Sequence, residues 1–180
     1  MFPQLSQTLN IILTILVAVV ALWVLFLFAA ILFAAFFRTA LKKHSKAMTV
    51  ILNAKYENVK KVYMLFQQYE IHTDSKLLET LESIDPKCFE KQNTEEGTKA
   101  RDLLSYLRDE ATFIVNKNKQ LLEYPDFVLA RNNVLELDNQ YRNSIALYNA
   151  DVLGYNYWIT FGPVRFIFKI FKAQKKEIIA

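Results

Sequence analysis

The hydrophobic pattern of this chain begins with one continuous apolar segment. Residues 11–37 contain no charged side chain, and Thr14 is the only clearly polar residue among them. An α-helix rises about 1.5 Å per residue, so a helix over this segment would be about 40 Å long. The hydrocarbon core of a bilayer is about 30 Å thick and is crossed by about 20 apolar residues. The pattern therefore predicts a transmembrane helix at residues 11–37.

After this segment, hydrophobic residues recur three or four positions apart, which is the period of an amphipathic α-helix. The recurrence predicts helices at residues 38–71, 76–84, 99–122 and 127–161, and a polar loop at residues 89–98. No glycine or proline separates the first of these helices from the apolar segment, so we expect it to continue the transmembrane helix. The last helix carries a nearly heptad apolar stripe, which is typical of long helices that pack almost antiparallel. The predicted fold class is all-α: an N-terminal transmembrane helix followed by an antiparallel bundle of long helices.

The residues expected to form the core of the bundle occupy these periodic apolar positions. They are Met48, Leu52, Val59, Tyr63 and Phe66 in the first helix, Leu104, Leu107, Ala111, Ile114 and Leu121 in the third, and Val134, Tyr141, Ile145, Tyr148, Val152, Tyr155 and Ile159 in the last. Lys55 lies among the polar positions of the first helix. Asp138 falls on the apolar stripe of the last helix, and a buried carboxylate needs a partner.

Short polar or proline-containing signals mark the ends of the helices. They are Asp74-Ser75 and Asp126 as N-terminal caps, Asp85-Pro86 as a break, and Gly162-Pro163 as the end of the last long helix. Asp and Ser side chains accept hydrogen bonds from the free N–H groups of a first helical turn. The residue before a proline avoids the α conformation, so a helix ends or bends there.

Charge is distributed unevenly along the chain. The net charge is +4, yet residues 38–53 and residues 164–180 each carry +4 and residues 54–163 carry −4. Both basic segments adjoin apolar ones, which favours attraction to anionic lipid headgroups. A nucleic-acid-binding protein would carry its positive excess on the domain itself. We therefore expect the lipid bilayer, and not a nucleic acid, as a partner.

The same charges predict the topology and the domain organisation. Basic residues follow the apolar segment but do not precede it, so the N-terminus is expected outside and the rest of the chain in the cytoplasm. The apolar run is longer than that of a cleaved signal peptide, which indicates a retained anchor in a cell membrane. The expected parts are a short extracytoplasmic N-terminus at 1–10, the transmembrane helix at 11–37, a cytoplasmic helical bundle domain at 38–163 and a basic amphipathic segment at 164–180.

The C-terminal segment has two interpretations. Its large apolar and basic residues alternate as in helices that lie in a membrane interface. Alternatively, it is a last core helix with a solvated basic edge. On the first interpretation, the candidate lipid-contacting residues of the chain are Arg38, Lys42 and Lys43 after the anchor and Arg165, Phe166, Lys169, Phe171 and Lys172 in the C-terminal segment.

A search for catalytic chemistry yields no convincing constellation. His44 and His72 are the two histidines, and neither has the Glu three residues earlier that a di-iron helical bundle requires. Cys88 is the single cysteine, so neither an internal disulfide nor a multi-cysteine zinc site can form. A nucleophilic pair of Cys88 with His72 would have to arise from two connecting segments. We expect no enzymatic activity, no cofactor and no metal site.

A Tyr-Asn pair is repeated after seven residues near the end of the last long helix, as Tyr148-Asn149 and Tyr155-Asn156. Seven residues are about two helical turns, so the two pairs lie on one face. Asn is unfavourable inside a helix because its side chain competes for backbone hydrogen bonds. The repeat predicts compensating bonds to a neighbouring helix, in a buried network that sets helix register. The alternative is an exposed Tyr/Asn strip that contacts a partner protein.

The repeat belongs to a longer set of motif positions. This set comprises Tyr124-Pro125-Asp126, Asn133, Leu137, Arg142, the two Tyr-Asn pairs, Ile159 and Pro163. It resembles the C-terminal half of LemA family proteins, although Phe161 stands one place earlier than that family's aromatic residue and Gly162 takes its position. The family's acidic and basic motif in the first cytoplasmic helix is not visible. The resemblance implies an antiparallel helical bundle behind one membrane span, and it implies no enzymatic chemistry.

Together these observations predict a membrane-anchored cytoplasmic scaffold or protein-interaction module. Its partner would be another membrane-associated protein or a second copy of the chain. The alternative is a membrane-remodelling or lipid-surface-binding protein that acts through its span and its basic amphipathic tail.

Overall fold

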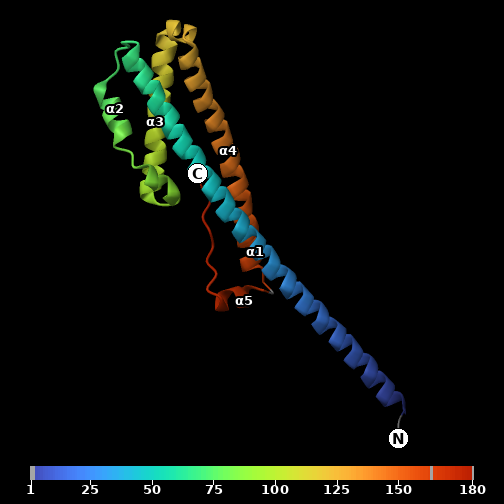
Figure 1. Ribbon diagram of the computed structural model, residues 1–180. Helices are drawn as coiled ribbons and strands as arrows, with labels where there is room; N and C mark the ends of the chain where they lie inside the picture. The colour runs from blue at the N-terminus through green and yellow to red at the C-terminus, as the bar shows by residue number, and fades with distance from the viewer. Residues whose placement is uncertain (1–2, 163, 180) are drawn as a thin grey trace. The chain divides into compact units, whose positions relative to one another are not determined.

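The computed structural model describes residues 3–162 and 164–179, and this part of the chain is helical with no strand. The element order is α1 (Pro3–Gln68), α2 (Ser75–Glu82), the 3₁₀ helix η1 (Pro86–Lys91), α3 (Glu95–Lys117), the 3₁₀ helix η2 (Lys119–Glu123), α4 (Pro125–Thr160) and α5 (Arg165–Ile170) (Figure 1). The all-α prediction is confirmed. Four residues lie outside the described part of the chain: Met1, Phe2, Pro163 and Ala180. Our predictions for these four residues therefore also lie outside it.

Helix α1 is 66 residues long and runs without interruption from the apolar segment into the polar-patterned part of the chain, as predicted. Its apolar part is long and apolar enough to cross a membrane, by length and composition. None of the residues in its most apolar 18-residue stretch is buried. The apolar side chains of this stretch therefore remain largely exposed in the described part of the chain.

The chain divides into two compact units. The first comprises Met1–Thr39 and Asp151–Lys176, and the second comprises Ala40–Ala150 and Glu177–Ala180. Both α1 and α4 contribute residues to each unit. We describe the units separately.

The second unit contains the main hydrophobic core. Residues 40–68 of α1, helix α3 and residues 125–150 of α4 lie side by side, with α2 beside them (Figure 1). Phe66 of α1 and Phe127 of α4 are both fully buried, with ring centroids 5.3 Å apart. The hydroxyl of buried Tyr63 donates a hydrogen bond of 2.9 Å to the carbonyl oxygen of Leu107, which gives this polar group the partner that burial demands.

Most of the predicted core residues are buried. Those confirmed are Met48, Leu52, Val59, Tyr63, Phe66, Leu104, Leu107, Ala111, Leu121, Val134, Tyr148, Val152, Tyr155 and Ile159, while Ile114, Tyr141 and Ile145 are half-buried. The three-and-four spacing of apolar residues thus identified the packed faces of α1, α3 and α4 correctly.

In the first unit, aromatic residues join α1 to the end of α4. The rings of Phe33 and Trp158 stack nearly parallel at 5.1 Å, and those of Phe26 and Phe161 lie 5.8 Å apart. A Cβ atom on Gly154 would come within 2.6 Å of the Phe37 ring. Any larger residue at position 154 would therefore displace that ring.

The predicted loop at residues 89–98 is wrong in large part. Helix η1 continues to Lys91, and α3 begins at Glu95. The hydroxyl of Thr94 caps α3 by accepting a hydrogen bond of 3.2 Å from the Gly97 N–H. A Cβ at Gly97 would come within 2.2 Å of the Lys91 carbonyl oxygen, so only glycine fits this turn. A segment rich in polar residues is therefore helical here because the cap and the glycine allow a tight reversal.

The other helix ends agree with the predictions only in part. Asp74 caps α2 as predicted, by accepting a hydrogen bond of 3.0 Å from the Lys76 N–H. Asp126 does not cap α4, because that helix already begins at Pro125, a residue suited to a first helical position. The helix predicted at 99–122 instead ends at Lys117 and is followed by η2.

Candidate functional site

Three charged residues meet in the interior of the second unit. Asp138 of α4 is only 8% exposed, and its carboxylate is paired with the Lys55 ammonium at 2.6 Å and with the Arg108 guanidinium. The expectation that a buried Asp138 needs a partner is therefore confirmed. Lys55, which we grouped with the polar positions of its helix, is only 3% exposed. The prediction for Lys55 is wrong because the Asp138 carboxylate offers this cation a partner inside the unit.

The electrostatics of this charge cluster follow from burial and pairing. Burial lowers the pKa of Lys55, and the bond and the charge of Asp138 offset only part of this shift. For Asp138, burial alone would raise the pKa, but the hydrogen bonds and charges of Lys55 and Arg108 hold it below its usual value. Lys55 and Asp138 thus stabilise each other's charged forms, while Arg108 also pairs with exposed Asp109 at 2.6 Å. Because its members are bonded to one another, the cluster is a structural feature.

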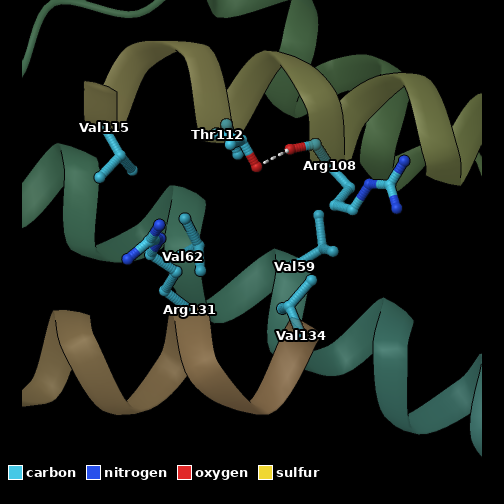
Figure 2. Close-up of a pocket in the computed structure, with 8 residues that line it drawn as sticks. Val59, Val62, Arg108, Thr112, Val115, Arg131 and Val134 are labelled. Carbon is cyan, nitrogen blue, oxygen red and sulfur yellow. Dashed lines mark hydrogen bonds between the residues drawn. The ribbon is translucent and has the colours of Figure 1, made fainter. Parts of the chain in front are cut away.

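A small cavity lies next to the charge cluster. It is lined by Val59, Val62, Arg108, Ala111, Thr112, Val115, Arg131 and Val134, and Figure 2 shows the hydrogen bond from the Thr112 hydroxyl to the Arg108 carbonyl oxygen beside it. Its volume is ≈ 20 Å³, and about 10–15 Å³ on this measure suffices for one water molecule. The cavity is therefore too small for an organic substrate.

The first Tyr-Asn pair lies in the second unit and holds the end of the chain. The Asn149 amide makes two hydrogen bonds to the backbone of Ile179: its N–H₂ group donates to the carbonyl oxygen at 2.8 Å, and its oxygen accepts from the N–H at 2.9 Å. Tyr148 is buried, and its hydroxyl accepts a bond of 3.2 Å from the Asn93 amide.

The second Tyr-Asn pair repeats this arrangement in the first unit. The Asn156 amide donates to the Lys176 carbonyl oxygen at 2.8 Å and accepts from the Lys176 N–H at 2.9 Å. Tyr155 is buried like Tyr148. The compensating bonds that we expected for the two asparagines therefore exist, but they reach the backbone of the C-terminal tail and not a neighbouring helix.

Asn149 and Asn156 are seven residues apart in α4, and their partners Ile179 and Lys176 are three residues apart in a tail without helical structure. Each asparagine bonds both backbone groups of its partner residue.

All eight candidate lipid-contacting residues are exposed. They are Arg38, Lys42, Lys43, Arg165, Phe166, Lys169, Phe171 and Lys172. Over its described residues 164–179, the C-terminal segment is helical only at α5, and the residue that α5 buries is Phe168. Phe166 is 57% exposed and Phe171 is 73% exposed. The described apolar residues of this segment thus divide between buried ones, Val164, Phe168 and Ile179, and exposed ones such as Phe166, Ile170 and Phe171.

Three of these candidates line one cavity of the first unit. Arg38, Phe171 and Lys172 contribute to a cavity of ≈ 500 Å³, together with Ile31, Ala34, Ala35, Tyr155, Phe168, Ala173, Gln174 and Lys176. The sequence did not single out Lys176. In the sequence, Lys176 is recognisable only as one of the basic residues of the tail. Its position at the cavity depends on its bond to Asn156, twenty residues earlier.

Cys88 and His72, the residues considered for catalysis, do not line the cavity of the first unit. Cys88 is a free, half-buried thiol in η1, and His72 lies between α1 and α2. Within the described residues, no group of three or more His, Cys, Asp or Glu side chains could hold a metal ion. No protein-family model, curated protein or solved structure matches this chain.

Proposed function

We propose that this protein is a single-pass membrane protein whose cytoplasmic helical domain serves as an anchored scaffold or interaction module. One observation carries the proposal. The same helix, α1, buries no residue of its most apolar stretch and contributes Leu52, Val59 and Phe66 to the core of the second unit. A continuous helix thus connects a largely exposed apolar segment to a packed domain.

The exposure of the apolar stretch supports a membrane environment. Side chains such as Leu16, Leu22 and Leu25 are each more than half exposed. Soluble monomers rarely expose contiguous apolar patches larger than about 300–600 Å². A core helix of a soluble protein would bury most of such a stretch. Lipid is therefore the environment in which these side chains are stable.

The arrangement of the second unit supports a bundle that binds proteins. We propose that its long helices pack antiparallel, in agreement with the heptad stripe of α4 and with the resemblance to LemA family proteins. Tyr106 and Phe113 lie seven residues apart on α3 and are 50% and 59% exposed. Aromatic residues are enriched where proteins bind one another, so this pair is the proposed contact for a partner.

Topology is tested by cysteine labelling in intact cells. In a Cys88→Ser background, single cysteines replace Ser6 and Lys61. A membrane-impermeant maleimide is expected to label the Ser6→Cys protein in intact cells and the Lys61→Cys protein only after lysis. Labelling of the Lys61→Cys protein in intact cells would overturn the proposed orientation. Recovery of the unmodified chain in the soluble fraction would overturn the anchor.

The scaffold role is tested by photo-crosslinking in cells. A photoreactive residue at Tyr106 or Phe113 is expected to give discrete protein adducts, whereas the same probe at exposed Glu123 serves as the control. Adducts to lipid alone, formed from probes at Phe166 and Phe171, would favour the second candidate, a lipid-surface-binding or membrane-remodelling protein. The outward apolar side chains of the C-terminal segment are the observation that favours this candidate.

A further inference from the structure

The largest cavity described in the first unit lies where the apolar part of α1 ends. Ile31, Ala34 and Ala35 on α1 line it, and so do Phe168 and Phe171. Its volume of ≈ 500 Å³ lies within the range of about 300–1,000 Å³ that is typical of small-molecule sites. The cavity is therefore large enough to hold a ligand.

The charged residues of this cavity all have the same sign. Arg38, Lys172 and Lys176 line it, and no acid appears among the described residues of its lining. Within the described part of the chain, none of the three forms an ion pair. Three cations of one sign around apolar walls make the local potential positive, and such a cleft favours an anion.

Two features of the backbone bring the lysines to the cavity. Lys172 adopts a left-handed conformation (φ 52°) directly after α5 and so turns the chain, and the Ala173 N–H bonds back to the Phe168 carbonyl oxygen at 2.9 Å. The Asn156 amide then fixes both backbone groups of Lys176. The cations are thus supplied by a tail whose course is held by defined bonds.

The position of Arg38 suggests the ligand. It is the first charged residue after the apolar segment of α1, so it would lie at the level of the headgroups if α1 crosses the membrane. We infer that the cavity binds the phosphate of one anionic phospholipid between Arg38, Lys172 and Lys176, with an acyl chain along Ile31, Ala34 and Ala35. This inference rests on the proposed membrane anchor.

Anionic lipid binding follows from the chemistry of the lining. A phosphate ester accepts hydrogen bonds from guanidinium and ammonium groups, and basic pockets on the cytoplasmic side of membrane helices bind lipid headgroups. The apolar wall distinguishes a lipid from free phosphate, because inorganic phosphate has no group to place against Ile31 or Phe171. The inferred site thus differs from general attraction of the exposed basic residues to a membrane surface.

The test is native mass spectrometry of the full chain in neutral detergent, with phosphatidylglycerol or phosphatidylcholine added stepwise. One phosphatidylglycerol molecule is expected to remain bound. The Arg38→Gln/Lys172→Gln/Lys176→Gln variant should bind it on the order of 100-fold more weakly, since each cation near an anionic lipid contributes about fivefold. The matched control is Lys61→Gln/Lys76→Gln/Lys87→Gln, which removes three exposed cations outside the cavity and should leave binding unchanged.

A second variant separates position from charge. Asn156→Ala keeps the net charge but frees Lys176, and it should weaken phosphatidylglycerol binding severalfold, whereas Asn143→Ala, at an exposed position of the same helix, should not. Circular dichroism confirms that each variant is folded.

Equal retention of both lipids, or unchanged binding by the triple cavity variant, would overturn the inference. So would binding of inorganic phosphate without retention of lipid, because the ligand source would then be free phosphate. The labelling experiment on Ser6→Cys tests the anchor independently, so failure of the lipid site and failure of the anchor are distinguishable.

Discussion

The two halves of helix α1 are both rich in apolar residues, yet most large apolar side chains of the first half are exposed and many of the second half are buried. Leu25 and Phe28 in the first half are 64% and 62% exposed, whereas Leu52 and Phe66 in the second half are 1% and 0% exposed. In the second half, apolar residues alternate with Lys and Glu at helical spacing, and in the first half they are uninterrupted. Apolar content alone therefore does not indicate burial in protein. The pattern distinguishes a helix that packs on one face from a helix that is apolar on all faces.

The largest expected effect comes from charges in the first half. Val20→Arg combined with Val24→Arg should abolish stable membrane insertion, since each Arg at the centre of a span costs about 2.5–3.5 kcal/mol. Alkaline carbonate extraction should then release the protein. Val50→Arg with Met64→Arg, at exposed apolar positions of the second half, is the control and should stay in the membrane. Release of both double variants would show that the first half of α1 is not more sensitive to charge than the second half.

A core substitution in the second half should act on stability and not on membrane association. Phe66→Ala is expected to lower the free energy of unfolding by about 3–5 kcal/mol, because it leaves a cavity between fully packed rings. Met64→Ala, two residues earlier and half exposed, should change it by less than about 0.5 kcal/mol. Denaturant titration followed by circular dichroism measures both values. Similar losses for the two variants would contradict the packing of α1 described above.

The charge cluster permits a sharper test of the second half. Asp138→Ala removes the partner of the buried Lys55 cation and should destabilise the domain by about 3 kcal/mol. Asp109→Ala removes the exposed partner of Arg108 and should cost less than about 1 kcal/mol. Thermal melting of the two variants compares them directly. A larger loss from Asp109→Ala would mean that Asp138 is not the central partner.

Stability should also depend on pH through Asp138. Its pKa in the folded protein lies below its ordinary value because Lys55 and Arg108 favour the carboxylate. The stabilisation is therefore fully present above the unfolded pKa of about 4 and is lost as the pH falls through the lower folded value. Melting curves between pH 2 and pH 6 should show a smaller acid-side loss for Asp138→Asn than for the unmodified chain. Parallel curves would exclude this contribution.

The smallest effect is expected at the asparagines. Asn149→Ala removes two hydrogen bonds to Ile179, and loss of one such bond corresponds to about 1 kcal/mol, or roughly fivefold in an opening equilibrium. Amide hydrogen exchange at Ile179 should accelerate at least fivefold, while the exposed Asn143→Ala control leaves it unchanged. This control matters because Ala also raises the helix propensity. Unchanged exchange in Asn149→Ala would show that these two bonds do not hold the tail at Ile179.

The sequence predicted those features that depend on local periodicity. The spacing of Leu104, Leu107 and Ala111 identified the buried face of α3, and the cap at Asp74 followed from the chemistry of its side chain. The absence of glycine and proline correctly predicted one continuous helix through the end of the apolar segment. Each of these inferences uses residues within one or two turns of each other.

Features that join distant segments could not be predicted. The repeat of Asn149 and Asn156 indicated that hydrogen bonds were required, but backbone groups accept and donate in the same way in any segment, so the C-terminal tail was not recognisable as the partner. Lys55 looked like a surface residue because its burial depends on Asp138, 83 positions later. The cavity likewise combines α1 with the tail, and no local pattern encodes that meeting.

The contact between the asparagines and the tail has a consequence for how this chain can change over time. Because the amides of Asn149 and Asn156 bond only to backbone groups, Glu177 and Ile178 between the two contact points can be exchanged for other residues without loss of these bonds. A single inserted or deleted residue there would shift one contact point by about 3.4 Å relative to the other. We therefore expect natural variation to change the residue types at positions 177 and 178 but not the number of residues between the two contact points.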